Sequence, residues 1–563
     1  MAVLRSPTLF FTTSPRTPFK MRAEISLLVR RFAGKKWSGN TELQSAFMRE
    51  LVQLPGFEGS CTLKDPALSA RDRITRAPKA LGLVDLECLA LTPAGRNFLD
   101  DDLAAEALLR QLLKFQLPSP YHKATERLAA TFWVRPYLEI LRLIHVLGRL
   151  SFDELWLFGM QLTNWRFFDG IVDKVKQFRI AKEQNKGRYK KFLGATREQV
   201  VTSIFSREIE SGQLHTREST CTSLDNFVDT KVRNLRDYAD ACLRYLRATG
   251  LVTVSNPGKT ITIIASRKDE VAYILKTVDR NPVFVDNEKA YREYLFSACV
   301  PALLTDDRDT LQRKAVDCAA AASLEEARTL DVFTLKRKIA QAQEIKKRAV
   351  VDAQITALKA FTKYDEVVRF YAEIKSKSVY DPPLSFEWNV WRTMTMIDGG
   401  DIRANLVFDD AGNPLATAPG NNADIVCDYG DFMVTVEVTL LTGNKQYDAE
   451  GEPVARHLGD LKCRTGKPVY CLFIAPKINP SIISYFFMLH KTNVKHYGGK
   501  SVVIPLALDS FVKMLTQAKN CGSIPAPQKI KDFCQYSMHI AECASDEEAW
   551  YEAISKKAEN WLS

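Results

Sequence analysis

The sequence predicts a multidomain α+β protein: a mainly helical N-terminal half with winged-helix-like modules, a helical linker, and a C-terminal α/β domain. Three observations lead to this prediction. The chain has 563 residues, 46% of them hydrophobic, and a single core does not grow to that size. A helix–hairpin–helix pattern occurs twice before residue 270, and a series of β-rich runs begins after residue 420.

The first helix–hairpin–helix pattern covers residues 71–99, where a basic stretch leads through Gly82-Leu83-Val84 into a short strand. Thr92 before Pro93 is a helix-start signal and predicts the next helix. Upstream, Asn40 is predicted to cap a helix whose apolar stripe belongs to the core. That stripe is formed by Leu43, Phe47 and Leu51.

The second pattern, residues 236–269, repeats the first with Gly250-Leu251-Val252, a turn at 256–258, a strand at 260–264 and a capping Ser266. Helix, two-stranded wing and helix is the order of a winged helix, which reads the major groove of DNA. The same order is also a generic scaffold, and one copy can serve only to pack on the other. We expect two DNA-recognition subdomains, residues 1–145 and 146–300.

Double-stranded DNA is the expected partner, and the formal net charge of +11 suits such a polyanion, although many ordinary cytosolic proteins carry as much. Guanidinium groups fit guanine edges and phosphates, so a basic run in the first module is predicted to read bases. The alternative is a solvated charged face. The run consists of Arg71, Arg73, Arg76 and Lys79. Lys186 and Arg188, in the lysine-rich stretch 182–191, are expected to contact phosphates.

Several classes of protein are disfavoured by the sequence. No segment reaches the roughly 20 uninterrupted apolar residues of a membrane span, and the N-terminus lacks the pattern of a cleaved leader. The 12 cysteines include no Cys-x-x-Cys pair, so neither a zinc site nor a redox site is expected. We therefore expect an intracellular protein without a membrane partner.

The C-terminal part begins with a predicted helical linker, residues 301–378, in which no glycine or proline occurs between Pro301 and Pro382. The predicted α/β domain, residues 379–563, follows. Its β-rich runs lie at 423–427, 432–440, 469–475 and 502–507.

Two carboxylates of this domain are predicted to share one face of a hairpin. A loop centred on Tyr429-Gly430 sets Asp424 opposite Thr435, which makes Glu437 its diagonal neighbour. Such neighbours lie roughly 7 to 8 Å apart and can close on one divalent ion. Two acids on adjacent strands are typical of nuclease sites in which Mg²⁺ lowers the pKa of bound water. Such sites usually have a lysine two residues after the second acid, but this chain has Thr439 there.

Glu387 is a third candidate, because it interrupts the apolar helix stripe of Leu384, Trp391 and Met394. A carboxylate there is costly unless it is paired or binds a metal. The alternative is a buried salt bridge to Arg392 or Arg403.

Further polar residues follow on the same segment. Either Glu450 or Glu452 can complete the site, but an exposed acidic turn fits equally well. Lys445 and Gln446 are available to orient a water molecule or to face the phosphate.

Nine stretches resemble the type IIS restriction endonucleases related to MlyI, PleI and AlwI, and their nicking relatives. They are SPRTP (14–18), ARDRITRAPKALG (70–82), PSPYH (118–122), KVRNLRDYADACLRY (231–245), FEWNVWR (386–392), TAPGNNADI (417–425), VEVT (436–439), EPVARH (452–457) and YCLFIAP (470–476). The resemblance implies a PD-(D/E)xK-type cleavage domain, prokaryotic cytoplasm, and cutting a few base pairs outside a short asymmetric site, expected to be GAGTC. It places the metal-site acids at Glu387, Asp424, Glu437 and Glu450, and the family's usual Glu-Val-Thr accounts for Thr439. Arg16, Arg233 and Arg236 lie in these stretches and are expected to contact DNA.

Three alternatives remain open from the sequence. The chain can be a strand-specific nicking endonuclease, the large subunit of a heterodimeric restriction enzyme, or a winged-helix DNA-binding regulator without catalysis. One chain carries one site, so cutting both strands requires a transient homodimer through the catalytic domain or a small nuclease subunit.

Overall fold

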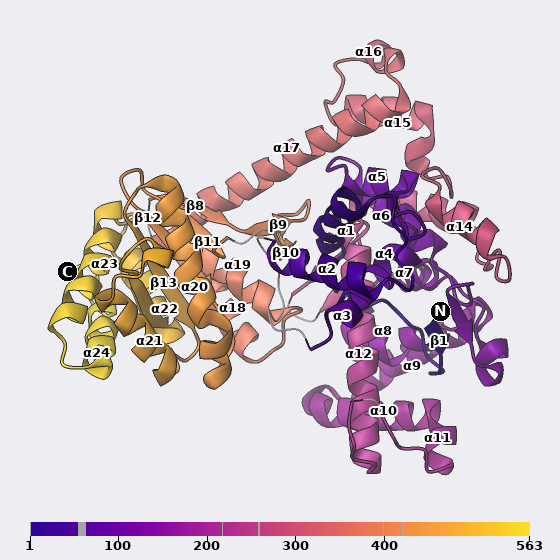
Figure 1. Ribbon diagram of the computed structural model, residues 1–563, viewed down its shortest axis with the longest axis horizontal. Coiled ribbons are helices and arrows are strands. Elements are labelled where there is room, and N and C mark those ends of the chain that lie inside the picture. Colours follow the sequence, from indigo (N-terminus) through magenta and orange to yellow (C-terminus); the bar gives the residue numbers. More distant parts are fainter. Residues whose placement is uncertain (1, 55–63, 217, 257–258, 398, 419–421) are drawn as a thin grey trace. The chain divides into compact units, whose positions relative to one another are not determined.

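The computed structural model describes residues 2–54, 64–216, 218–256, 259–397, 399–418 and 422–563 (Figure 1). They form two compact units, the first ending at Glu344 and the second beginning at Ile345. The predicted turn at 256–258 and the stretch 417–425 fall partly outside the described residues. Among the described residues, no helix is both long and apolar enough to cross a membrane.

The first unit opens with helices that surround a short hairpin. The strand β2 (Val84–Asp85) pairs antiparallel with β3 (Ala90–Leu91). Two further short strands, β1 (Ala2–Leu4) and β4 (His122–Ala124), pair in parallel. The helices are α1 (Lys20–Phe32), α2 (Thr41–Val52), α3 (Pro66–Ile74), α4 (Ala77–Ala80), α5 (Pro93–Leu99) and α6 (Ala104–Lys114).

The rest of the first unit is built around a three-stranded sheet in the order β5-β7-β6. Its strands are β5 (Leu150–Ser151), β6 (Val252–Ser255) and β7 (Thr260–Ile263). Its helices are α7 (Pro136–Leu147), α8 (Phe152–Leu157), α9 (Phe168–Gln184), α10 (Tyr189–Ile204), α11 (Ser206–Glu210), α12 (Leu224–Ala248), α13 (Lys268–Thr277), α14 (Glu288–Phe296), α15 (Arg308–Asp317) and α16 (Leu324–Thr329).

Local signals explain much of this unit. The side chains of Asn40 and Thr92 accept hydrogen bonds from the amides of Leu43 and Gly95, so both predicted helix caps are confirmed. The predicted cap at Ser266 is wrong, because a short 3₁₀ turn places the start of α13 one residue later, after Arg267, without a side-chain cap.

The two Gly-Leu-Val segments share a backbone requirement. Gly82 has φ +65° and Gly250 has φ +69°, and residues other than glycine rarely adopt this backbone conformation. A Cβ added at Gly82 would also lie 2.6 Å from the Cβ of Leu295. The glycine therefore permits both the turn into β2 and the close approach of α14.

The segment predicted as a separate linker, residues 301–378, is divided between the units. Its residues up to Glu344 belong to the first, and those from Ile345 belong to the second. The helix α17 (Val332–Lys359) contains this boundary, and α18 (Tyr364–Lys375) follows it.

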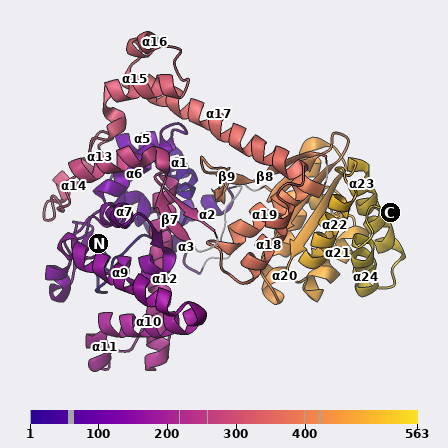
Figure 2. The same cartoon turned by 180° about the vertical axis from the view of Figure 1, so that it is seen from behind.

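The second unit contains a five-stranded mixed sheet in the order β14-β13-β12-β11-β8. Figure 2 shows this unit, in orange and yellow, from behind. The strand β11 (Ile425–Asp428) pairs antiparallel with both β8 (Asp401–Ala404) and β12 (Met433–Val438). The strand β13 (Val469–Ala475) pairs in parallel with both β12 and β14 (Val503–Ala507). The strand β8 and a side hairpin of β9 (Leu406–Phe408) and β10 (Pro414–Thr417) were not expected from the sequence.

Helices cover both faces of this sheet. One face contacts α20 (Asn444–Thr465) and α21 (Pro480–Lys491), and the other contacts α19 (Pro382–Ile397) and α22 (Leu508–Asn520). The helices α23 (Pro527–Cys543) and α24 (Glu547–Ala558) pack beyond β14 and α21. The unit's core therefore lies in two layers, with one layer under each face.

Candidate active site

The four predicted acids come from four elements of the second unit. Glu387 lies in α19, Asp424 directly precedes β11, Glu437 lies in β12, and Glu450 lies in α20. Because β11 and β12 are neighbours and α19 and α20 pack on opposite faces of the sheet, the fold brings these separated positions into one region.

The hairpin pairs Asp424 and Glu437 more directly than expected. The predicted register set Cys427 against Phe432, but the structure pairs Cys427 with Val434 and Ile425 with Val436. The prediction of the register is wrong because the turn is centred one residue later, on Gly430-Asp431, which shifts the pairing by two. A shift of two keeps each side chain on its face, and one further step places Asp424 directly opposite Glu437.

Backbone hydrogen bonds fix both carboxylates. Oδ2 of Asp424 accepts a hydrogen bond of 2.8 Å from the amide of Val438, and the amide of Asp424 donates to Glu437. On α19, Oε2 of Glu387 accepts a hydrogen bond of 3.3 Å from the hydroxyl of Thr417. Each carboxylate thus has a defined position.

The acids influence one another electrostatically. Glu437 is buried, with 5% of its surface exposed, and burial raises its pKa well above the usual value. The neighbouring Glu450 and, more weakly, Glu387 raise it further. Burial also raises the pKa of Glu450, against hydrogen bonding from Thr439. Carboxylates that disfavour one another's charge create a place where a cation is stabilising.

His457 is a neighbour for which the sequence had suggested no role. Its Nδ1 lies 2.8 Å from Oε1 of Glu437. Burial lowers the pKa of His457 to about 4, so the ring is neutral at neutral pH and holds the carboxyl group through a hydrogen bond. His457 follows Glu450 by two helical turns on α20, and that spacing was the signal that it shares a face with the acid.

The donor set fits a hard divalent cation, because Mg²⁺ and Ca²⁺ prefer carboxylate oxygens. The hydrogen bonds of these acids come from backbone amides and from the side chains of Thr417, Thr439 and His457. Within the described ranges, no three His, Cys, Asp or Glu side chains converge closely enough to form a ready-made metal cluster.

The cations proposed as partners of Glu387 form other ion pairs. Arg392 pairs with Glu366, and Arg403 pairs with Asp401. Salt bridging therefore accounts for these two arginines without Glu387.

Of the two polar residues predicted to face the substrate, Gln446 is buried. Its amide donates to the carbonyls of Leu441 and Lys477 and accepts from the amide of Asn479, so it holds the loop structure. The expectation for Gln446 is wrong. Lys445 is exposed at the start of α20.

The basic run of the first module is largely engaged within the unit. Arg71 donates to Gln44, and Arg73 forms a 2.5 Å ion pair with the buried Glu24. The ammonium group of Lys79 lies 4.4 Å from the ring centroid of Tyr121. Arg76 pairs with Asp72 one turn away. A base contact by Arg73 would require its pair with Glu24 to open.

The other predicted DNA contacts lie on or near the unit's surface. Lys186 pairs with Glu183 at 2.5 Å, and Arg188 is exposed beside it. On α12, Arg233 and Arg236 are exposed three residues apart. Arg16 pairs with Asp237 of the same helix at 3.0 Å. The exposed members of this set remain accessible to a phosphate backbone.

Comparison with known proteins defines the class of this chain. A family model described as AlwI restriction endonuclease matches residues 80–514, more than half of the chain. The protein is thus a restriction endonuclease, a sequence-specific deoxyribonuclease that binds DNA and, like its family in general, uses a divalent metal. In particular, the chain belongs to the AlwI restriction endonuclease family. The alternative of a non-catalytic regulator is wrong.

No curated protein matches the chain. Among solved structures, the small subunit (R.BspD6I2) of the heterodimeric restriction endonuclease R.BspD6I is similar at 29% identity over 35% of this chain and 95% of that chain, with a TM-score of 0.28. The BpuJ1 endonuclease binding domain, in complex with pyrene- and phenanthrene-modified DNA, is similar at 12% identity over 50% of this chain and 91% of that chain, with a TM-score of 0.32.

Proposed function

We propose that the chain is a type IIS endonuclease that hydrolyses DNA with Mg²⁺, cutting a few base pairs outside a short asymmetric site, GAGTC. The observation that carries the chemistry is the electrostatic coupling of the buried Glu437 to Glu450 and Glu387, together with the register that places Asp424 opposite Glu437. The recognition sequence rests on the resemblance of the chain alone.

The four acids have different proposed roles. Asp424 and Glu437 hold the divalent ion, and Glu387 or Glu450 orients the attacking water or a second ion. When bound, Mg²⁺ lowers the pKa of water and stabilises charge that develops on the phosphate. The amide of Val438 keeps the Asp424 carboxylate in place.

His457 completes the proposed site as a positioning residue. Its role is assigned through the hydrogen bond between its Nδ1 and Oε1 of Glu437. This bond, together with the hydrogen bond from the amide of Asp424, restrains the rotamer of the Glu437 carboxylate. His457 therefore prepares Glu437 for its role.

Recognition is assigned to the subdomains 1–145 and 146–300. Across residues 136–263, which begin before the predicted boundary at 146, the order α7, β5, α8, α12, β6, β7, with β5 paired to β7, is typical of a winged helix, and α9 to α11 form an insertion. The exposed Arg233 and Arg236 on α12, with Lys186 and Arg188, are assigned to phosphate and base contacts. This arrangement supports a DNA-reading role for the unit.

Cleavage of the second strand requires a second catalytic domain, because the proposed site occurs once in the chain. A transient homodimer through the second unit or a separate small subunit supplies it. If neither forms, the product is a nick in one strand. Nicking is thus the alternative activity of the same site.

The Glu437→Gln variant tests the site. We expect DNA cleavage to fall on the order of a thousandfold, because several kcal/mol of charge stabilisation is lost. Affinity for DNA, measured by gel shift without Mg²⁺, should be unchanged. Glu542→Gln, which alters an exposed pair with Lys500 in the same unit, is the control and should cut normally. Cleavage that survives in Glu437→Gln would exclude this assignment.

A further inference from the structure

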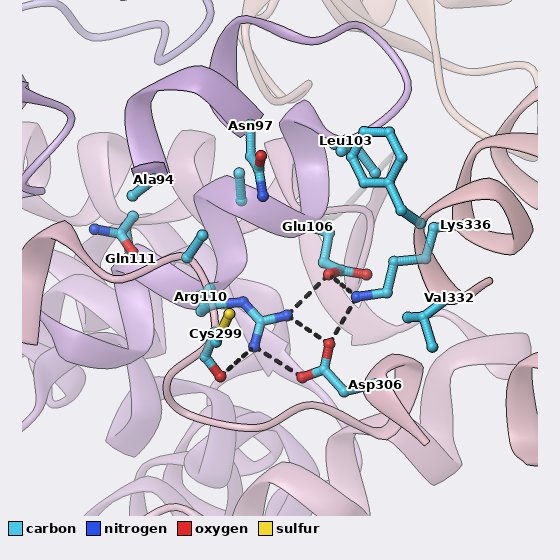
Figure 3. A pocket seen from close by; sticks show the side chains of 13 residues that line it. Ala94, Asn97, Leu103, Glu106, Arg110, Gln111, Cys299, Asp306, Val332 and Lys336 are labelled. Carbon is cyan, nitrogen blue, oxygen red and sulfur yellow. Dashed lines mark hydrogen bonds and ion pairs between the residues drawn. The ribbon is translucent and has the colours of Figure 1, made fainter. Parts of the chain in front are cut away.

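A cavity of about 230 Å³, lined by apolar and charged side chains, lies where α6 meets the start of α17 (Figure 3). Its lining includes two cations, Arg110 and Lys336, and two carboxylates, Glu106 and Asp306. Because the charges balance and all four are paired, the cluster needs no charged ligand. It serves instead to attach one segment to another.

Arg110 forms the base of the cluster on α6. Its guanidinium makes two hydrogen bonds to Asp306, of 2.9 and 3.0 Å, and one of 2.9 Å to Glu106. It also donates to the carbonyls of Cys299 and Pro301. With 4% of its side chain exposed, Arg110 fixes the segment that precedes α15.

Lys336 is the member that belongs to α17. Its ammonium group lies 2.6 Å from Oε1 of Glu106 and 2.6 Å from Oδ1 of Asp306. Only 12% of the side chain is exposed, so solvent screens these pairs weakly. The dashed lines in Figure 3 show that Lys336 reaches the same two acids as Arg110.

Apolar contacts do not replace this attachment. The buried side chains of this part of α17, Leu335 and Ile339, pack in a separate cluster with α15 and α16, represented by Leu311 and Ala327. Between the start of α17 and α6 lies the cavity, and the other polar contacts of α17 with this region are more exposed. They are Arg337 with Asp100 and Gln341 with Asp102.

The same helix also takes part in the second unit. Past Ile345, Leu358 is buried in that unit's core, and Gln354 donates to the carbonyl of Ala411. Lys336 therefore attaches the start of α17, and the same helix continues into the second unit.

We propose that Lys336 is a positioning residue that fixes the bond at which the enzyme cuts, by locking the start of α17 to α6 of the recognition unit. This inference rests on the proposed function, because it concerns the distance between the recognised site and the cut. A tight attachment keeps that distance constant, and a loose one lets the nuclease unit reach neighbouring bonds.

Lys336→Met tests the proposal, since it keeps the length of the side chain and removes the ammonium group. Purified full-length variants are incubated with Mg²⁺ and a DNA that carries one recognition site, and the ends are mapped on both strands to single nucleotides. We expect wild type to cut at one bond on each cut strand and Lys336→Met to spread its ends over neighbouring bonds. Affinity for the site, measured without Mg²⁺, should be unchanged.

Two further variants separate positioning from general damage. Lys338 lies on the same helix as Lys336 and forms an exposed ion pair with Glu326 of α16. Lys338→Met removes that pair and should cut like wild type. Lys336→Arg retains the charge and should restore the single bond. Thermal unfolding of each variant shows whether the fold is intact, and Lys336→Arg decides the case if Lys336→Met does not fold.

The failures are distinguishable. If wild type cuts at no fixed distance from its site, the proposed function fails. If wild type cuts at a fixed bond and Lys336→Met keeps that same bond, the role of Lys336 is refuted. The same holds if Lys338→Met spreads its ends as much as Lys336→Met.

Discussion

The main expected effect of removing Arg73 is a loss of stability of the first unit and not a loss of direct base contacts. Its guanidinium is 2.5 Å from Glu24, whose side chain is 5% exposed, and Oε2 of Glu24 has no hydrogen-bond partner among the described atoms. Arg73→Ala leaves this carboxylate buried without its cation. Such losses cost 3 to 5 kcal/mol for a fully buried pair, and because Arg73 is 24% exposed we expect about 3 kcal/mol.

The pH dependence of this loss has a definite sign. Burial already raises the pKa of Glu24 against the opposing effect of Arg73, so its pKa should rise further in Arg73→Ala. A carboxyl whose folded pKa lies above its unfolded value loses stability as pH rises through that folded pKa. The deficit of Arg73→Ala relative to wild type should therefore be larger at pH 8 than at pH 5.

Urea unfolding, followed by tryptophan fluorescence at both pH values, measures these free energies. The double variant Glu24→Gln/Arg73→Ala removes the charge as well and should recover part of the stability at pH 8. A variant Arg73→Ala with wild-type stability but relaxed discrimination between cognate and altered sites would refute the structural role. It would instead support direct base reading by Arg73.

Two other predictions concern the same unit. Gly82→Ala should reduce the free energy of unfolding by about 3 kcal/mol, from the positive φ and the 2.6 Å approach to Leu295, whereas Gly212→Ala, with φ +69° and open space, should lose about 1 kcal/mol. Equal losses in the two unfolding curves would show that the contact with α14 does not matter. Arg188→Ala should weaken binding to cognate and non-cognate DNA alike and lower the slope of log affinity against log salt by about one. A loss confined to the cognate sequence, measured by fluorescence anisotropy, would contradict a phosphate contact.

Elements with strong local signals were predictable from the sequence. The caps at Asn40 and Thr92 place a hydrogen-bonding side chain directly before an apolar periodic run, which is a local pattern. The strands β11 to β14 follow from short runs of apolar and β-branched residues. The acids at 424 and 437 could be assigned to one face because strand parity survives the two-residue error in register.

Tertiary contacts decided what the sequence could not show. The pairing of Arg73 with Glu24 joins α3 to α1 across 49 positions, and no local pattern distinguishes it from a solvated arginine. Gln446 looked available because it is polar, yet three backbone groups satisfy it, and two of them belong to the distant residues Lys477 and Asn479. No role could be assigned to His457 from the sequence, because its hydrogen bond to Glu437 depends on how α20 packs against β12.

The most direct test of the central claim uses supercoiled plasmid with one GAGTC site, incubated with the purified protein with and without Mg²⁺ across protein concentrations. The account predicts cleavage that depends on Mg²⁺, with ends at a fixed distance outside the site on at least one strand. Linear product that rises with protein concentration would identify self-association, and open circle alone would identify nicking. Absence of any Mg²⁺-dependent cut at a fixed distance from GAGTC would contradict the account.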